Sequence, residues 1–178
     1  MKRMYLFLLA ALVLASCGSE PTLQKYFVEK TEDKNFVAVD VSPSILNLDP
    51  ATLNAEQKAA LQSFEKMNIL AFKAAEDSTL YNAERSKVKA LLKDEKYQEL
   101  MKFGSAGASG SLSFVGDAEH IDEFILFMAQ KETGFAVVRI LGKDMNPTGV
   151  MTLMSLLPQA NLDQGQLKPL QDMLGKKQ

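Results

Sequence analysis

The residue types that most often carry chemistry are scarce in this sequence. Its 178 residues include one cysteine, Cys17, and one histidine, His120. A single cysteine forms no disulfide within the chain, and one histidine cannot supply the multi-histidine ligand set of catalytic zinc. If a modification consumes Cys17, the folded part also lacks a thiol for catalysis or metal binding. We therefore expect no metal or other cofactor, and a fold stabilised by packing alone.

A large excess of either charge is also absent. The chain has 20 Lys and Arg residues against 22 Asp and Glu residues, a formal net charge of -2. Because proteins bind nucleic acid largely through clustered basic residues, this balance excludes nucleic acid as an expected partner. It also provides no basic face to hold the chain on anionic lipid. Attachment to a membrane therefore needs another device.

An apolar run long enough to span a membrane is missing too, but a shorter one follows Met1-Lys2-Arg3. Residues 4–15 are uncharged and apolar, whereas a spanning helix needs about 20 such residues. This length is typical of a signal peptide. The run ends in Leu14-Ala15-Ser16-Cys17, which resembles a bacterial lipobox. We therefore predict that residues 1–16 are a lipoprotein signal peptide and that Cys17 is lipidated.

The predicted anchor places the chain in the cell envelope. Two or more acyl chains hold a protein stably on a membrane. The tether after Cys17, residues 18–21, reaches at most about 14 Å. Gly18 is not the aspartate that retains lipoproteins at the inner membrane, and Glu20 is the only acidic residue nearby. We expect a lipid-anchored protein of the outer membrane that faces the periplasm.

The hydrophobic pattern predicts one α+β domain over residues 35–178, preceded by the lipidated cysteine, tether and N-terminal helix of residues 17–34. We expect a mixed five-stranded sheet in β-α-β-α-β-β-β-α order, covered by helices, with parallel neighbours at two β-α-β crossovers. The expected strands are 36–41, 69–74, 112–115, 121–129 and 135–141. The expected helices are 22–30, one that begins at Asp49-Pro50 or at the Asn54–Gln57 capping box, one from 77 to about 101 with a break at Asp94, 146–157, and a last turn near 167–173.

Two stretches of the chain resemble a known family. One is Phe36–Val41 with the following Ser42–Leu48, and the other is the strand pair around Glu123–Leu126 and Val137–Gly142. In these patterns of apolar and turn residues, the chain resembles the small envelope lipoproteins of Bacteroidota that are classed as a domain of unknown function. The resemblance implies an envelope protein with no assigned activity and no catalytic residues to carry over. It also suggests a role in envelope stress or assembly.

One polar cluster is a candidate for chemistry. His120 stands among Asp117, Glu119 and Glu123, which is compatible with an acid–base or metal site. The spacing lacks the alternating ligands of a calcium loop, and a solvated turn before a strand is the better interpretation. A small hydrolase or transferase that uses these carboxylates remains an alternative, which perturbed carboxylate pKa values in a deep pocket would favour.

Three other motifs have plain structural explanations. The glycine-rich stretch 104–110 runs from an expected helix into a strand, the reverse of a phosphate loop, and we interpret it as a connector. Ser63 and Lys66 match Ser-x-x-Lys, but fit the polar side of an amphipathic helix with Leu61 and Phe64 on its apolar side. Met145, Met151 and Met154 fit core packing better than copper ligation.

These features together favour a binding or adaptor module that is not an enzyme. Its expected partners are the membrane, through Cys17, and an unknown envelope protein. A second alternative is a carrier for an apolar ligand. That function needs an empty volume between sheet and helix, lined by residues such as Phe72, Phe124 and Met154.

Overall fold

The computed structural model describes residues 20–73, 78–105, 107–117 and 119–156, with Gly165 and Lys168, and gives the backbone alone for Ser78 and Met154. Residues 1–16 and Cys17, the expected cap at Asp77 and the expected helical turn near 167–173 lie outside this part of the chain. No helix of the described residues combines the length and the apolar character that crossing a membrane requires.

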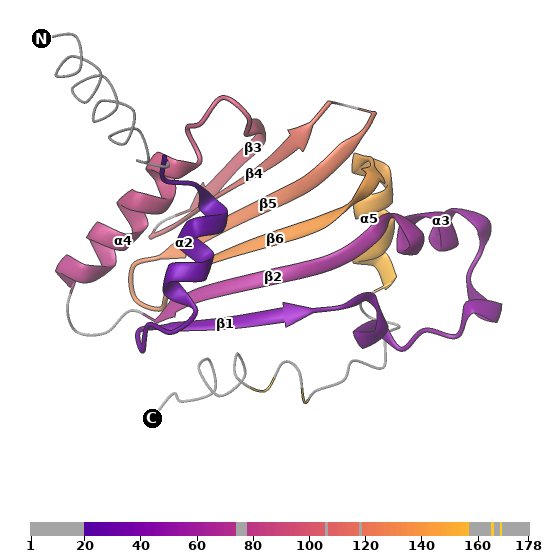
Figure 1. The fold of residues 1–178 in the computed structure, drawn as a ribbon, viewed down its shortest axis with the longest axis horizontal. Helices are drawn as coiled ribbons and strands as arrows, with labels where there is room; N and C mark the ends of the chain where they lie inside the picture. Colours follow the sequence, from indigo (N-terminus) through magenta and orange to yellow (C-terminus); the bar gives the residue numbers. More distant parts are fainter. Residues whose placement is uncertain are drawn as a thin grey trace, which may run out of the picture.

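The centre of the domain is one antiparallel sheet of six strands in the order β1-β2-β6-β5-β4-β3 (Figure 1). The expected five-stranded mixed sheet is therefore wrong, although the fold is α+β. Each neighbouring pair is antiparallel. The strands are β1 Phe36–Val41, β2 Phe64–Lys73, β3 Gln98–Ser105, β4 Ala108–Gly116, β5 Ile121–Gln130 and β6 Gly134–Met145.

One expected crossover exists but does not place its two strands side by side. Helix α4, Ser78–Leu91, connects β2 to β3, which run in the same direction. Three other strands, β6, β5 and β4, stand between them. The other expected crossover, from β1 to β2, joins antiparallel neighbours. A β-α-β order in the sequence gives parallel neighbours only when no later strand inserts between the two.

Strand β3 was missed because its alternation is broken. Tyr97, Leu100 and Met101 follow a helical spacing, which predicted a helix here. In the structure the register shifts between Glu99 and Met101, so Leu100 is an extra residue in the strand. Such a bulge hides the two-residue period that identifies a strand. The glycine-rich stretch 104–110 is likewise not a loop from helix to strand but the tip of the β3–β4 hairpin, with Gly107 at φ +85°.

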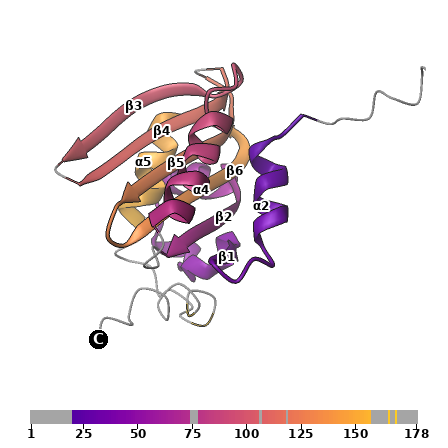
Figure 2. The same ribbon diagram turned by 90° about the vertical axis from the view of Figure 1, so that its left-hand side faces the viewer.

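One face of the sheet, called the front here, is covered by α2, Leu23–Lys30, and α4 (Figures 1 and 2). Thr22 caps α2, since its side chain accepts from the backbone N–H of Lys25. Beneath the helices, Phe36, Phe72 and Phe135 lie side by side across β1, β2 and β6. The ring centroids of Phe72 are 5.1 Å from Phe36 and 5.2 Å from Phe135. This aromatic row is the centre of the main core.

The opposite, back face is covered at one end by α3, Ala55–Ser63, and α5, Pro147–Leu156, and near β1 by the 3-10 turn η2, Pro43–Leu46. Figure 2 shows α2 and α5 on opposite sides of the sheet. The Asn54–Gln57 capping box is confirmed as the start of α3, while Asp49-Pro50 begins only the short 3-10 turn η3, Pro50–Thr52. The sequence predicts Phe64 on the apolar side of this helix, but in the structure Phe64 is the first residue of β2. Its side chain packs against Leu153.

Candidate functional site

The end of the back face that no described helix covers forms an apolar groove. Its volume is about 610 Å³, and none of the described residues that line it is charged. It lies where the β3–β4 and β5–β6 turns meet the strand ends. Six of the residues that line it are Ile69, Ala71, Phe103, Met128, Ala136 and Val138.

Small side chains make the floor of this groove. In the strand register Phe103 faces Gly110, Gly110 faces Met128, Met128 faces Ala136, and Ala136 faces Ala71. The Phe103 ring lies over Gly110, since a Cβ there would be 2.3 Å from ring atom Cε2. Gly110 thus has a packing role that the connector interpretation missed. A row of glycine and alanine between larger residues leaves a depression in the sheet.

Large apolar side chains in the groove, Phe103 and Met128, and on the neighbouring part of β3, Leu100 and Met101, are exposed to solvent. Leu100 is 43% exposed, Met101 53%, Phe103 43% and Met128 41%. Every residue of β3 is exposed, so no described helix covers either face of this edge strand. An apolar surface of this kind beside an unpaired strand edge is typical of an interaction site.

The groove and the N-terminal helix lie on opposite faces of the sheet. Tyr26 of α2 packs on the front against Phe36, whose ring neighbours Phe72 and Phe135 also line the groove. Tyr97, just before β3, hydrogen-bonds the backbone of Leu23 at the start of α2. That contact lies on the front face, at the end of the sheet where β3 begins. The groove lies on the back face at the other end, seven residues along β5 from Glu123 to Gln130, or about 24 Å. The groove therefore lies on the face of the sheet that α2 does not cover.

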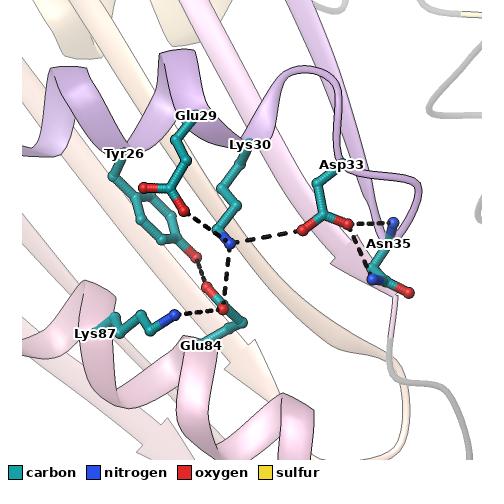
Figure 3. A network of polar contacts seen from close by, with 7 residues as sticks. All are labelled: Tyr26, Glu29, Lys30, Asp33, Asn35, Glu84 and Lys87. Atoms are coloured by element: carbon teal, nitrogen blue, oxygen red, sulfur yellow. Dashed lines mark hydrogen bonds and ion pairs between the residues drawn. The ribbon is translucent and has the colours of Figure 1, made fainter.

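A buried ion network fixes α2 to α4 (Figure 3). Glu84, 3% exposed, accepts a hydrogen bond of 2.8 Å from the Tyr26 hydroxyl. The Lys30 Nζ lies 3.3 Å from its Oε1, and the Lys87 Nζ lies 2.8 Å from the same atom. Lys30 also contacts Glu29 at 3.2 Å and Asp33 at 3.5 Å. These contacts satisfy both charges where α2 and α4 meet.

The pKa directions follow from these contacts. Burial alone would raise the pKa of Glu84, but hydrogen bonds from Lys87, Tyr26 and Lys30 lower it below the ordinary value. Burial opposes the charge of Lys30, whereas Glu29 and Glu84 raise its pKa. Burial and the Glu84 hydrogen bond raise the pKa of Tyr26. All three groups therefore keep the protonation states that the network needs at neutral pH.

A comparison with family models assigns most of the chain. Residues 26–153 match the family described as a domain of unknown function, DUF4252. The chain belongs to the DUF4252 family. The DUF4252 match contains all six strands, the groove and the network of Tyr26, Lys30 and Glu84. Neither the curated proteins nor the solved structures gave a significant match.

The carboxylates near His120 do not converge in this DUF4252 chain. Asp117 Oδ1 accepts hydrogen bonds of 2.9 Å from the backbone of Glu119 and of His120, which lower its pKa. Glu123 is instead ion-paired with Arg139 on the front face. His120 Nδ1 lies 3.3 Å from Asp144, with both side chains exposed. Among the described residues no group of three or more His, Cys, Asp or Glu side chains is placed to hold a metal.

Arg139 and Asn68 form a polar row beneath α2 that sequence reasoning missed. Arg139, 7% exposed, also lies under the ring of Phe27, with 5.3 Å between its Cζ and the ring centroid. Asn68, on the neighbouring strand β2, hydrogen-bonds Asp40 on β1. Alternating polar residues within apolar strands were the only signal for this row. Arg139 and Asn68 both line a cleft of about 250 Å³ between α2 and the sheet.

The other sequence motifs are dispersed. The Ser63 hydroxyl donates to the backbone oxygen of Ala60 at the end of α3, and Lys66 is an exposed residue of β2. Met145 is 1% exposed and Met151 is 71% exposed, so they do not share an environment. Phe72 and Phe124 are both buried, but belong to core clusters on opposite faces of the sheet. Phe72 and Phe124 therefore do not line one common cavity, which was the condition for a carrier, and the side chain of Met154 lies outside the described part of the chain.

Proposed function

We propose that this DUF4252 chain is a membrane-anchored envelope lipoprotein whose domain is not an enzyme and binds another envelope protein, as an adaptor in envelope stress or assembly. The observation that carries the proposal is the apolar groove on the back face of the sheet, the face that α2 does not cover. A module that is tethered through the residues before α2 can engage a partner on the opposite face.

The sequence Leu14-Ala15-Ser16-Cys17 supports the anchoring part of this proposal. A lipidated Cys17 would hold the chain on a membrane, by preference the periplasmic face of the outer membrane. Cys17→Ser tests this directly. We expect the variant to keep its uncleaved signal peptide and therefore to migrate at the larger, unprocessed size. Full retention in membranes at the mature size would overturn the anchor.

The lining of the groove defines the chemistry of its occupant. Ile69, Val138 and Met128 line the groove with apolar side chains, and none of the described lining residues is charged, so a charge buried there would lack a partner in the lining. The partner segment should therefore be apolar and uncharged where it enters. Phe103, at the β3 end of the groove, contacts the same segment.

A photo-reactive side chain in intact cells tests this surface. We would place it at Met128, inside the groove, and at Val28, an equally apolar residue on α2 that is 71% exposed. We expect an adduct with one envelope protein from position 128 and none from position 28. Ala136→Trp, which fills the groove, should abolish the adduct while the far-ultraviolet circular dichroism of the purified chain stays unchanged. Equal adducts at both positions, or an adduct insensitive to Ala136→Trp, would contradict the proposal.

A carrier for an apolar ligand is the second candidate function, and the same groove favours it. Its volume of about 610 Å³ lies within the usual range for ligand sites. A carrier purified from membranes should retain a lipid-like molecule that native mass spectrometry detects. Ala136→Trp should then remove that molecule, whereas an adaptor loses its protein adduct instead.

A further inference from the structure

The two edges of the sheet differ in how far they are protected. At one edge, β1 has three buried residues, because α2 and η2 cover its faces. At the other edge, all eight residues of β3 are exposed. An edge of this length presents unpaired N–H and C=O groups that readily pair with another strand. Strand β3 is therefore the edge at which the sheet can continue.

Opposite charges make this edge complementary to itself. Glu99 and Lys102 face Ser113 and Ser111 on β4, on the same face of the hairpin, and their side chains are 2.8 Å apart. Consider two antiparallel copies of β3 related by a twofold axis between Leu100 and Met101. Glu99 of each copy then lies opposite Lys102 of the other, so both charges stay paired. An isologous interface requires self-complementarity of this kind.

The apolar side chains of β3 add to the same seam. Met101 and Phe103 face the back of the sheet, where they are 53% and 43% exposed. In the register that pairs Glu99 with Lys102, Met101 lies opposite Leu100 of the other copy and Phe103 lies opposite Gln98. These apolar side chains then lose part of their contact with water, which favours association. The two grooves then lie on one face of a sheet that runs through both copies.

We propose that β3 pairs with β3 of a second copy of this chain to form a homodimer. Charged residues and bulges protect the edges of other sheets from pairing, but those of β3 do not prevent the dimer. A lysine deters pairing when it meets a like charge or an apolar strand, but here Lys102 meets Glu99. The bulge at Leu100 lies at the proposed axis, so the pairs that define the seam, Glu99 with Lys102 and Gln98 with Phe103, stand on either side of it. The dimer does not require that the groove holds another protein.

Charge reversal with two differently tagged full-length chains in intact cells tests the dimer. A photo-reactive side chain at Leu100, on the proposed axis, reports contact between copies. Glu99→Lys alone sets positive charges opposite each other, and Lys102→Glu alone sets negative ones, so each variant should crosslink to itself roughly fivefold less than the wild type. A mixture of the two variants restores both opposite-charge contacts. We expect it to crosslink at the wild-type level.

Lys34→Glu is the matched control, because Lys34 is an exposed lysine between α2 and β1, away from β3. It should leave the crosslink unchanged. If the mixture crosslinks no better than the single variants, the proposed pairing is wrong. An adduct from Leu100 to a different protein, with none to the chain itself, would also overturn it and show that a partner strand occupies the edge. Neither result affects the test of the groove at Met128, so the two proposals fail separately.

Discussion

The front and back of the sheet differ although the same strands build both. Phe72 and Phe135 point to the front, where α2 and α4 cover them. Their neighbours in sequence, Ala71 and Ala136, point to the back and form the floor of the open groove. Successive residues of a strand alternate between faces, so one segment specifies both surfaces. Bulky aromatic residues stabilise the fold on one side, while small residues leave space for an occupant on the other.

The largest expected effect comes from removing the centre of the front face. Phe72→Ala should lower the free energy of unfolding by about 4 kcal/mol, because a 1% exposed ring leaves a cavity among Phe36, Phe135 and Tyr81. Urea denaturation of the purified chain measures this. Ala136→Val on the back face is the contrast, since the groove has room for two methyl groups, and should change stability by no more than about 0.5 kcal/mol. Similar losses for both variants would show that the back face is packed like the front.

The sequence predicted most elements of both faces but not their arrangement. Strong signals gave α2, β1 and the capping box of α3, because Thr22 and Asn54 start helices through local hydrogen bonds. Strand order depends on contacts between distant segments, and no local pattern showed that β6 inserts beside β2. The bulge at Leu100 hid β3 itself.

A second way to break the front face is to remove its buried charge. Glu84→Gln should cost about 2 kcal/mol, because the buried Lys30 loses its one buried carboxylate partner and keeps only the more exposed Glu29 and Asp33. Urea denaturation at neutral pH again gives the value. Lys87→Ala is the matched control, since its side chain is 55% exposed, and its loss should stay below about 0.5 kcal/mol. Equal effects would mean that the network is no stronger than a surface ion pair.

The same network predicts how stability depends on pH. The folded state holds the pKa of Glu84 below its ordinary value of about 4.3. The stabilisation is therefore present above that pH and is lost as the pH falls further and Glu84 becomes protonated in the folded state. Unfolding free energies of the wild type and of Glu84→Gln should converge toward pH 3. The pKa values of Tyr26 and Lys30 are raised in the folded state, so their protonated forms stabilise the fold at lower pH. This stabilisation is lost at alkaline pH, and stability should fall as the pH rises above about 10. A constant difference between the two proteins from pH 7 to pH 3 would contradict the assignment to Glu84.

The candidate site was harder to predict than the fold. Glu123 is close in sequence to Asp117 and His120, but its partner Arg139 stands on the neighbouring strand β6. Sequence proximity favoured the wrong cluster. The groove left even less signal, because Gly110 and Ala136 show their role only when the strand register places them beside Met128.

The smallest effect concerns the floor of the groove. In Gly110→Ala the new Cβ would be 2.3 Å from the Phe103 ring and 2.8 Å from the backbone oxygen of Phe127. The exposed ring can rotate away but the backbone cannot, so we expect a loss of about 1 kcal/mol in urea denaturation. Phe103→Ala removes the ring contact, and the double variant should therefore lose less than the sum of the two single losses. Additive losses would mean that the ring does not lie over Gly110, and the back face would then be a flat apolar surface rather than a groove with a glycine floor.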